Sequence, residues 1–220
     1  MPAVVIVNLG TGNLYSVYKA LVHVGAGDVR ISSNPSEIRN AGHLVLPGQG
    51  AIGTWMRQLG KQPELAAAVR ARLDDGPVLG ICLGRQALYA YSEENGGVAC
   101  LGLLDGEVRH FAASRGQADA AAHRGDGRRK IPHMGWNQVQ QTSGHPLWRG
   151  IDDQRRFYFV HSYYVEANNE HEVAGTCTYG NRFTAAATRD NLFATQFHPE
   201  KSQRDGLRLL QNFIHWKGVH

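Results

Sequence analysis

A cysteine between a predicted strand and a predicted helix is the residue best suited to nucleophilic chemistry. Cys82 follows the apolar run Pro77–Ile81 and has one glycine two residues before it and another two residues after it. This is the pattern of a nucleophile elbow, a sharp strand-to-helix turn in which glycines let the neighbouring chain approach closely. The turn would place the sulfur at a helix N-terminus, which favours the thiolate. We therefore expect Cys82 to be a nucleophile; a small buried core cysteine is the alternative.

A histidine and a glutamate that could serve this cysteine lie near the C-terminus. A cysteine nucleophile needs a base to manage its proton and a third group to orient that base. His198 comes directly after the predicted strand Leu192–Gln196, and Pro199 ends the strand pairing there. Glu200 is two residues beyond His198, so its carboxylate can fold back onto the imidazole and fix its tautomer. We predict that Cys82, His198 and Glu200 form a catalytic triad.

Glycine-rich turns could supply backbone amides to stabilise a tetrahedral intermediate. The amide of Leu83, the residue after the nucleophile, is one predicted donor. The loop Pro47–Gly50 could supply another, because its glycines permit a flip that points an amide inward. A simple turn is the alternative for this loop. Residues Gly10–Gly12 begin a dinucleotide-binding pattern, but Tyr15 stands where the third glycine belongs, so we expect no nucleotide cofactor.

Short apolar strands alternating with helices must position these residues. Strands are expected at Val4–Asn8, Val29–Ile31, His43–Leu46 and Val78–Ile81, and helices at Leu14–Val22, Ile52–Leu59, Pro63–Leu73 and after Cys82. This order predicts an α/β fold with a doubly wound, mainly parallel central sheet flanked by helices. Ligands bind outside the carboxyl ends of the strands in such sheets. The loops Gly10–Asn13, Pro47–Gly50 and Gly80–Gly84 should therefore converge on one crevice.

The second half of the chain adds further strands to this architecture. They are expected at Trp136–Gln140, Phe157–Tyr163, Val173–Thr178, Phe183–Thr188 and Leu192–Gln196, before a last helix near Asp205–Trp216. We expect residues 1–220 to form one domain. Residues 112–130 contain no large apolar side chain, which predicts a mobile surface loop. Its basic charge would keep it solvated, and binding of a partner is the alternative.

Composition narrows the class of protein. The net charge is +4, but the dense basic cluster Arg124–Lys130 lacks interleaved aromatic readers, so we expect no nucleic-acid binding. No apolar stretch reaches the length of a membrane span, and the N-terminus does not have the pattern of a signal peptide. Cys82, Cys100 and Cys177 are widely spaced, which argues against disulfides and zinc and for a reducing cytoplasm. We expect no metal and no cofactor.

With these motifs in place, the chain resembles the class I, triad-type glutamine amidotransferases. Gly80–Gly84 and Phe197–Glu200 are shared by that wide family. Within it the chain is similar to the glutaminase subunits of imidazole glycerol phosphate synthase, through Pro132–Asn137 and Tyr158–Tyr163. Other matching segments are Gly10–Leu14, Leu46–Gly50, Ser92–Glu94 and His198–Ser202. The resemblance covers essentially the whole chain apart from residues 112–130.

The resemblance implies a reaction and a role for each matching residue. Cys82 would attack the side-chain carboxamide of L-glutamine, His198 would protonate the departing ammonia and then activate water, and Glu200 would hold His198. The residues that would bind glutamine are Gln86, Glu94, Ser162 and Tyr163, with Glu94 suited to the α-ammonium group. The residues that would offer oxyanion amides are Gln49, Gly50 and Leu83.

The resemblance also implies a partner. Ammonia would pass to a separate cyclase subunit with a (β/α)8 barrel, in a heterodimer. The residues that would belong to the docking face are Asn13, Trp136, Tyr158 and Lys201. For these residues capping, core packing and surface solvation are the alternatives.

Position 85 departs from the family pattern, and other functions stay open. The family most often has methionine three residues after the cysteine, whereas this chain has Arg85. We expect Arg85 to favour ionisation of Cys82 or to contact the partner; the alternative is a stem over apolar surface with its head in water.

Alternative functions are an amidotransferase subunit of a different synthase, a cysteine peptidase and a non-catalytic scaffold. A peptidase would cleave peptides without a partner, and a scaffold would tolerate Cys82→Ala.

Overall fold

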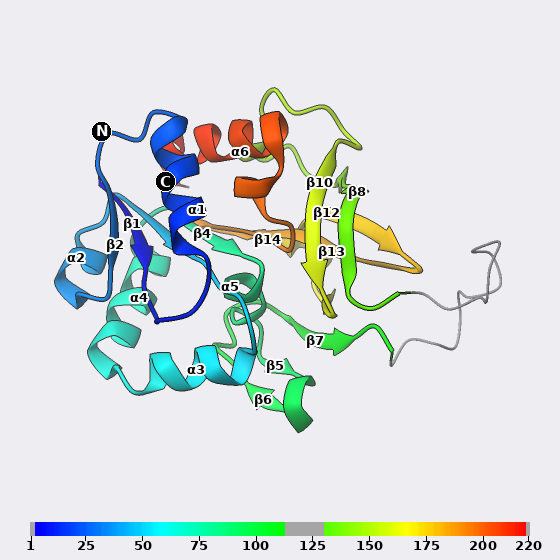
Figure 1. Cartoon of the computed structure of the whole chain (residues 1–220), viewed down its shortest axis with the longest axis horizontal. Helices are drawn as coiled ribbons and strands as arrows, with labels where there is room; N and C mark the ends of the chain where they lie inside the picture. Colours follow the sequence, from blue (N-terminus) through cyan, green and yellow to red (C-terminus); the bar gives the residue numbers. More distant parts are fainter. Residues whose placement is uncertain (1–2, 113–129, 219–220) are drawn as a thin grey trace.

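Strands and helices alternate through the first part of the chain, as the sequence predicts (Figure 1). The computed structural model describes residues 3–112 and 130–218. The elements in order are β1 (Val4–Val7), α1 (Leu14–His23), β2 (Val29–Ser32), α2 (Pro35–Arg39), β3 (His43–Leu46), α3 (Ile52–Gly60), α4 (Pro63–Asp75), β4 (Val78–Ile81) and α5 (Leu83–Gln86). Only α2 was not expected. Its start has strong local signals, because Asn34 caps it and Pro35 occupies its first turn.

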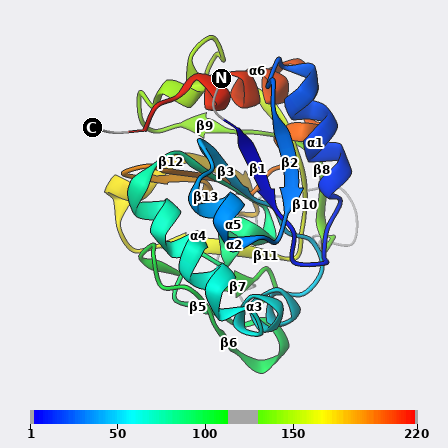
Figure 2. The same ribbon diagram turned by 90° about the vertical axis from the view of Figure 1, so that its left-hand side faces the viewer.

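Five parallel strands form the centre of the fold, in the order β2-β1-β3-β4-β14, where β14 is Leu192–Thr195. Successive residues of β1 point to opposite faces, so Val4 and Ile6 join one core while Val5 and Val7 join the other. Helix α1 and the last helix, α6 (Gln203–His215), cover the first face. Helices α2, α3 and α4 cover the second (Figure 2). The predicted α/β fold with a mainly parallel, helix-flanked central sheet is confirmed.

The remaining strands extend this sheet in mostly antiparallel pairs. From β14 the order continues β13-β11-β7-β5-β6, while β8 and β10 form a separate antiparallel pair. The bounds are β5 (Tyr91–Ser92), η1 (Glu94–Gly96), β6 (Val98–Ala99), β7 (Gly106–His110), β8 (His133–Gln138), β9 (Gln140–Gln141), η2 (Pro146–Trp148), β10 (Arg156–His161), β11 (Tyr163–Ala167), η3 (Glu170–Glu172), β12 (Val173–Tyr179), β13 (Asn181–Arg189) and η4 (Pro199–Lys201). The predicted strand Phe157–Tyr163 is divided: β10 ends at His161, and β11 begins at Tyr163 in the other sheet.

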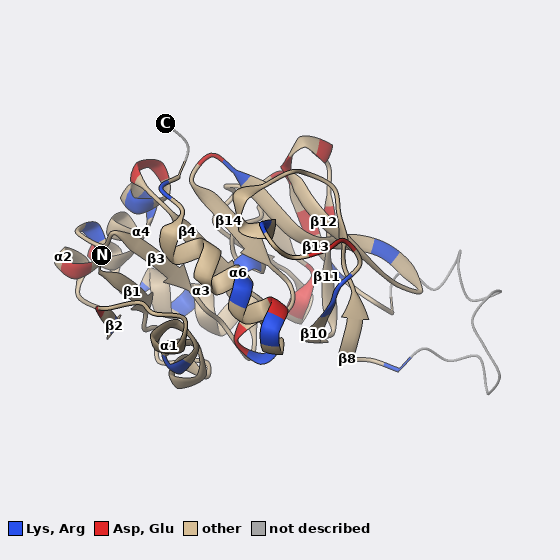
Figure 3. Cartoon of the chain, turned by 90° about the horizontal axis from the view of Figure 1, so that it is seen from above, with Lys and Arg blue, Asp and Glu red and all other residues tan. Residues whose placement is uncertain are grey.

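Each of the helices α1 and α6 buries one face against the core. In α1, Val17 and Leu21 are buried, whereas Val22 is 46% exposed. In α6, Leu210 and Phe213 are buried. Acidic and basic positions are interspersed along α4 and α6 (Figure 3). Within the described ranges, none of the helices combines the length and the apolar composition that a membrane span requires. Apart from its two end residues, the loop predicted at 112–130 lies outside the described residues.

Candidate active site

Cys82 lies at a strained turn between β4 and α5. Its backbone has φ 53° and ψ −107°, which a non-glycine residue rarely adopts. The Cys82 amide donates to the Thr195 carbonyl at 2.8 Å, and the Cys82 carbonyl accepts from the amides of Arg85 and Gln86, each at 3.1 Å. The first hydrogen bond ties the turn to β14, and the other two close the turn into α5. The predicted elbow is therefore present in the backbone.

The two flanking glycines are required by packing. A Cβ atom on Gly84 would collide with the carbonyl oxygen of Leu46 at the end of β3. A Cβ atom on Gly80 would lie 3.1 Å from the Ala194 Cβ on the neighbouring β14. Both positions thus admit only glycine without a shift of the backbone or of a neighbour. Helix α5 has only four residues, so its dipole is small and side chains must provide most of the polarity around the sulfur.

The three glycine-rich loops converge beside this turn, as predicted. A Cβ atom on Gly48 would lie 2.7 Å from the Gly84 nitrogen, and one on Gly12 would lie 3.5 Å from the Gln49 nitrogen. The loop Pro47–Gly50 is held from the α3 side, because the Trp55 indole donates to the Pro47 carbonyl at 3.1 Å. The contacts bring the predicted oxyanion loop against the cysteine elbow.

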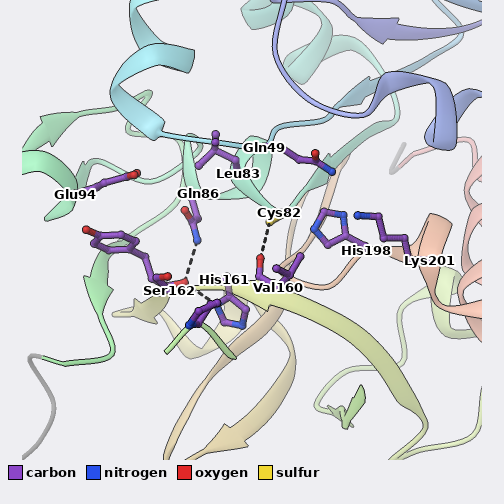
Figure 4. Close-up of a pocket in the computed structure, with 13 residues that line it drawn as sticks. Gln49, Cys82, Leu83, Gln86, Glu94, Val160, His161, Ser162, His198 and Lys201 are labelled. Carbon is purple, nitrogen blue, oxygen red and sulfur yellow. Dashed lines mark hydrogen bonds between the residues drawn. The ribbon is translucent and has the colours of Figure 1, made fainter. Parts of the chain in front are cut away.

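His198 and Glu200 form a buried pair beside Cys82. The His198 Nδ1 atom lies 2.7 Å from Glu200 Oε1, and the two side chains are only 2% and 1% exposed. Because the carboxylate accepts, Nδ1 carries a proton. Burial disfavours the charged imidazole, but the Cys82 sulfur and the Glu200 carboxylate outweigh this effect and raise the pKa of His198 to about 10. Figure 4 shows the imidazole next to Cys82.

A pocket of about 430 Å³ opens over the sulfur (Figure 4). The predicted site residues that line it are Gln49, Gly50, Cys82, Leu83, Gln86, Glu94, Ser162, Tyr163, His198 and Lys201. Pro132, Val160 and His161 complete the lining. Glu200 contacts the pocket only through His198. The predicted oxyanion and glutamine-binding residues are therefore all brought to the nucleophile.

Two of the predicted glutamine-binding side chains also brace the pocket. Gln86 is 3% exposed, and its amide nitrogen donates to the Tyr163 carbonyl at 3.1 Å. Glu94 accepts a hydrogen bond from the Ile52 amide at 2.8 Å, at the start of α3. Figure 4 places the Glu94 carboxylate across the pocket from Cys82. The carboxylate therefore stands at a fixed distance from the nucleophile, as recognition of a charged substrate end requires.

Gln196 is a site residue that the sequence reasoning missed. Its side chain is completely buried, and its amide nitrogen donates to the Cys82 sulfur at 3.7 Å. Gln196 directly follows β14 and stands two residues before His198, inside the Gln-Phe-His-Pro-Glu segment. That position, next to a predicted base at a strand end, was the available signal.

A buried histidine pair was missed as well. His133 and His161 are register partners on β8 and β10, with His133 Nδ1 2.9 Å from His161 Nε2. His161 Nδ1 must carry a proton, because it lies 2.7 Å from the Tyr163 carbonyl. His161 Nε2 therefore accepts from His133. Burial lowers the pKa of His161 to about 3 and of His133 to about 4, so both rings are neutral and fix the backbone at Tyr163.

Arg85 differs from both solvent-facing expectations. Its side chain is 0% exposed, so it neither reaches a partner nor places its head in water. All four residues of α5 are buried beneath the turn, and the arginine stem runs inward because α5 has no solvent-facing side. The guanidinium donates through Nη1 to the Gln196 side-chain oxygen at 2.9 Å and through Nη2 to the Tyr89 hydroxyl at 3.3 Å.

The residues predicted for docking differ in their surroundings. The Asn13 side chain caps α1, accepting from the Ser16 amide at 3.2 Å. Trp136 is 42% exposed and packs edge-to-face on Tyr158, its register partner across β8 and β10. Met134, two residues earlier on the same face of β8, is 62% exposed. Met134, Trp136 and Tyr158 together form a partly exposed apolar face, which we call the β8–β10 face.

The other two cysteines lie outside the pocket, and burial raises the pKa of Cys100 to about 11 and that of Cys177 to about 12. Neither thiol is therefore activated. Across residues 3–112 and 130–218, no group of three or more His, Cys, Asp and Glu side chains is arranged to hold a metal ion.

Comparisons with known proteins place this site in a family. Residues 5–216 match the model of the class-I glutamine amidotransferases. The chain is 50% identical over 218 residues to the imidazole glycerol phosphate synthase subunit HisH 1 of Pseudomonas aeruginosa, covering 99% of both chains. It is 46% identical over 217 residues to the HisH subunit of Acinetobacter baylyi, covering 98% of this chain and 99% of the relative.

Solved structures of lower sequence identity share the fold. PurLQS from Thermotoga maritima aligns with a TM-score of 0.71 at 17% identity, over 97% of this chain and 98% of that chain. The glutaminase domain of Trypanosoma brucei CTPS aligns with a TM-score of 0.60 at 14% identity, over 97% of this chain and 92% of that chain. These likenesses support the fold, and the full-length sequence matches show the family. The chain belongs to the class-I glutamine amidotransferases and, among them, to the HisH subunits of imidazole glycerol phosphate synthase.

Proposed function

We propose that this chain is a glutaminase subunit that hydrolyses L-glutamine to glutamate and ammonia in histidine biosynthesis. Ammonia passes to a cyclase partner with a (β/α)8 barrel, which makes imidazole glycerol phosphate and an aminoimidazole carboxamide ribonucleotide. The carrying observation is the pocket in which Cys82 meets the buried His198–Glu200 pair. The full-length relatives named as HisH subunits support the same reaction.

In the first half of the reaction, the Cys82 thiolate attacks the side-chain carbonyl carbon of glutamine. The electron pair of the carbonyl moves to oxygen, where the amides of Leu83 and Gln49 are the proposed donors. His198 then gives its Nε2 proton to the departing nitrogen, and ammonia leaves behind a thioester on Cys82. Glu200, at 2.7 Å from Nδ1, keeps the ring oriented throughout.

In the second half, water attacks the thioester. His198 takes the proton of this water at Nε2, the sulfur departs as thiolate, and glutamate is released. The raised pKa of His198 suits the acid step, and the oriented ring suits the base step. At the other end of the pocket, we assign the α-ammonium group to Glu94 and the remaining polar contacts to Gln86, Ser162 and Tyr163.

The docking of the cyclase partner is proposed at the β8–β10 face. Aromatic and methionine side chains are enriched at the centres of protein interfaces, and this face exposes Met134, Trp136 and Tyr158 together. Lys201 lies beside it on η4 and also lines the pocket, so the same face adjoins the reaction site. Asn13 is assigned to the rim. The free thiols fit a reaction in the cytoplasm.

Glutamine hydrolysis measured with and without the cyclase and its nucleotide ligand tests this function. We expect weak hydrolysis by the isolated chain, strong stimulation by the liganded partner, and no activity in Cys82→Ser. Rapid hydrolysis without a partner would contradict a gated subunit, and peptide cleavage would favour a peptidase. An amidotransferase of a different pathway would instead co-purify with a synthase that does not bind the ribonucleotide.

A further inference from the structure

The guanidinium of Arg85 is a buried charge with an unusual set of partners. It is 0% exposed, and its described hydrogen bonds go to the neutral side chains of Gln196 and Tyr89. Its Nε atom has no hydrogen-bond partner among the described residues. Burial lowers the pKa of Arg85, yet arginine remains charged in proteins. A buried charge needs a compensating group, so its counter-charge must be found nearby.

The neighbouring tyrosine does not supply that charge. Burial raises the pKa of Tyr89, so its hydroxyl stays protonated at neutral pH and is only a dipolar partner. In the described part of the chain, no carboxylate forms a salt bridge with Arg85. The nearby carboxylate of Glu172 contributes to the raised pKa of Tyr89 and is not among the groups that act on Arg85. The remaining group of acidic character near Arg85 is the thiol of Cys82, whose charge acts on the guanidinium.

The Gln196 amide connects the guanidinium to the sulfur. Its oxygen accepts from Arg85 Nη1 at 2.9 Å and from Gln86 Nε2 at 3.2 Å. Two donors on one oxygen fix the orientation of the amide, because a flipped amide would turn its own N–H groups against them. The nitrogen of Gln196 must then face Cys82, which it does at 3.7 Å from the sulfur. The positive charge of Arg85 polarises this amide toward a better donor.

We infer that Arg85 is a positioning residue that holds Cys82 as a thiolate through the Gln196 amide, and that this thiolate balances the buried guanidinium. The inference rests on the proposed role of Cys82 as the nucleophile. It concerns the state of the sulfur before substrate binds. Methionine, the residue usual at this position in the family, offers neither the charge nor the donor.

Other charged and titratable groups also face the sulfur and must stay constant in a test. From the remaining elements around the pocket these are His198, Lys201, His161, Glu94 and Tyr163. His198 is directly coupled to the sulfur, since Cys82 raises the pKa of His198. None of these groups contacts Arg85 through a described hydrogen bond, so replacing Arg85 leaves their contacts in place. The charge of Arg85 contributes to the lowered pKa of His161, but burial is the main cause, so His161 stays neutral without it.

The test is the pH dependence of Cys82 alkylation in the full chain. Iodoacetamide reacts with the thiolate, and mass spectrometry of the peptide that contains Cys82 separates it from Cys100 and Cys177. We expect Arg85→Met to raise the pH midpoint of alkylation by about one unit, the lower end of the effect of a nearby opposite charge.

Two further variants make the result specific. Gln196→Met removes the connecting amide and should raise the midpoint in the same direction, with little further change when combined with Arg85→Met. Arg30→Met removes an exposed arginine that pairs with Asp28 on the edge strand β2, which β1 and β3 separate from β4, so the midpoint should not move. Circular dichroism verifies folding, and the methionine usual at position 85 should be accommodated.

An unchanged midpoint in folded Arg85→Met or Gln196→Met overturns the inference. Alkylation needs neither glutamine nor the cyclase, so the two proposals fail separately. If the alkylation midpoint shifts but the wild-type chain never hydrolyses glutamine, the role of Arg85 stands and the proposed function is rejected. If the cyclase stimulates hydrolysis but the midpoint does not shift, the proposed function stands and the role of Arg85 is rejected.

Discussion

Replacing Glu200 by glutamine removes a buried charge while keeping the shape of the side chain. Glutamine can still present an oxygen to the proton on His198 Nδ1, the nitrogen that lies 2.7 Å from Glu200 Oε1 in the wild type, so the variant isolates the charge from the hydrogen bond. Both side chains are at most 2% exposed, and solvent screens them little. Two unit charges about 4 Å apart interact by about 4 kcal/mol at an effective dielectric constant of about 20.

This energy corresponds to about three pKa units or about a 10³-fold change in rate, if it all acts on the charged imidazole. We therefore expect Glu200→Gln to lower the pKa of His198 from its value of about 10. The His198 imidazolium would then persist over a narrower range of pH. The kcat for glutamine hydrolysis should fall by up to about 10³-fold.

The assay measures glutamate formation by the complex with the liganded cyclase across a range of pH. In Glu200→Gln the alkaline limb of kcat should move to lower pH, because the imidazolium loses its proton earlier. Glu166→Gln is the matched control: this carboxylate also pairs with a cation, Arg109, at 2.8 Å, but is 57% exposed. A Glu200→Gln enzyme with wild-type kcat and an unmoved alkaline limb would refute the electrostatic role.

Two further predictions concern stability. Gly84→Ala would force a Cβ atom against the Leu46 carbonyl and should lower the free energy of unfolding, measured in urea, by about 1–3 kcal/mol. Gly144→Ala is the control and should be neutral, because open space surrounds Gly144. Equal losses of stability in the two variants would contradict this packing. Folding lowers the pKa of His133 to about 4 and that of His161 to about 3. Below about pH 6.5 these two histidines therefore take up protons in the unfolded chain but stay neutral in the folded chain, and this difference favours unfolding. Thermal unfolding should therefore occur at a lower temperature at pH 5 than at pH 7, with a smaller difference in His161→Gln; no change in that difference would count against the buried neutral pair.

The local parts of the site could be predicted because each depends on a short segment. The elbow needs small residues on both sides of Cys82, and Gly80 and Gly84 are held to that requirement by β14 and by the end of β3. The His198–Glu200 pair needs only two residues of separation and a turn at Pro199. A spacing rule therefore identifies these features without knowledge of the rest of the fold.

The parts that were missed depend on neighbours distant in sequence. Arg85 is buried because all four residues of α5 are enclosed by the fold, and its partner Gln196 is 111 residues away. The division of the predicted strand at Ser162 arises because β10 pairs with β8 while β11 pairs with β7 and β13. Apolar alternation cannot distinguish one long strand from two that enter different sheets.

The same four residues set the backbone conformation and the electrostatics of the cysteine turn: Cys82, Arg85, Gln86 and Gln196. The strained conformation of Cys82 persists because the amides of Arg85 and Gln86 both donate to its carbonyl. The side chains of these two residues meet again on the oxygen of Gln196, whose nitrogen faces the sulfur. Every residue except proline retains the backbone amide, so a substitution at Arg85 keeps this hydrogen bond of the turn and removes the side-chain hydrogen bonds to Gln196 and Tyr89. The side chain at position 85 can therefore be exchanged to test its charge while the backbone of the elbow keeps its hydrogen bonds.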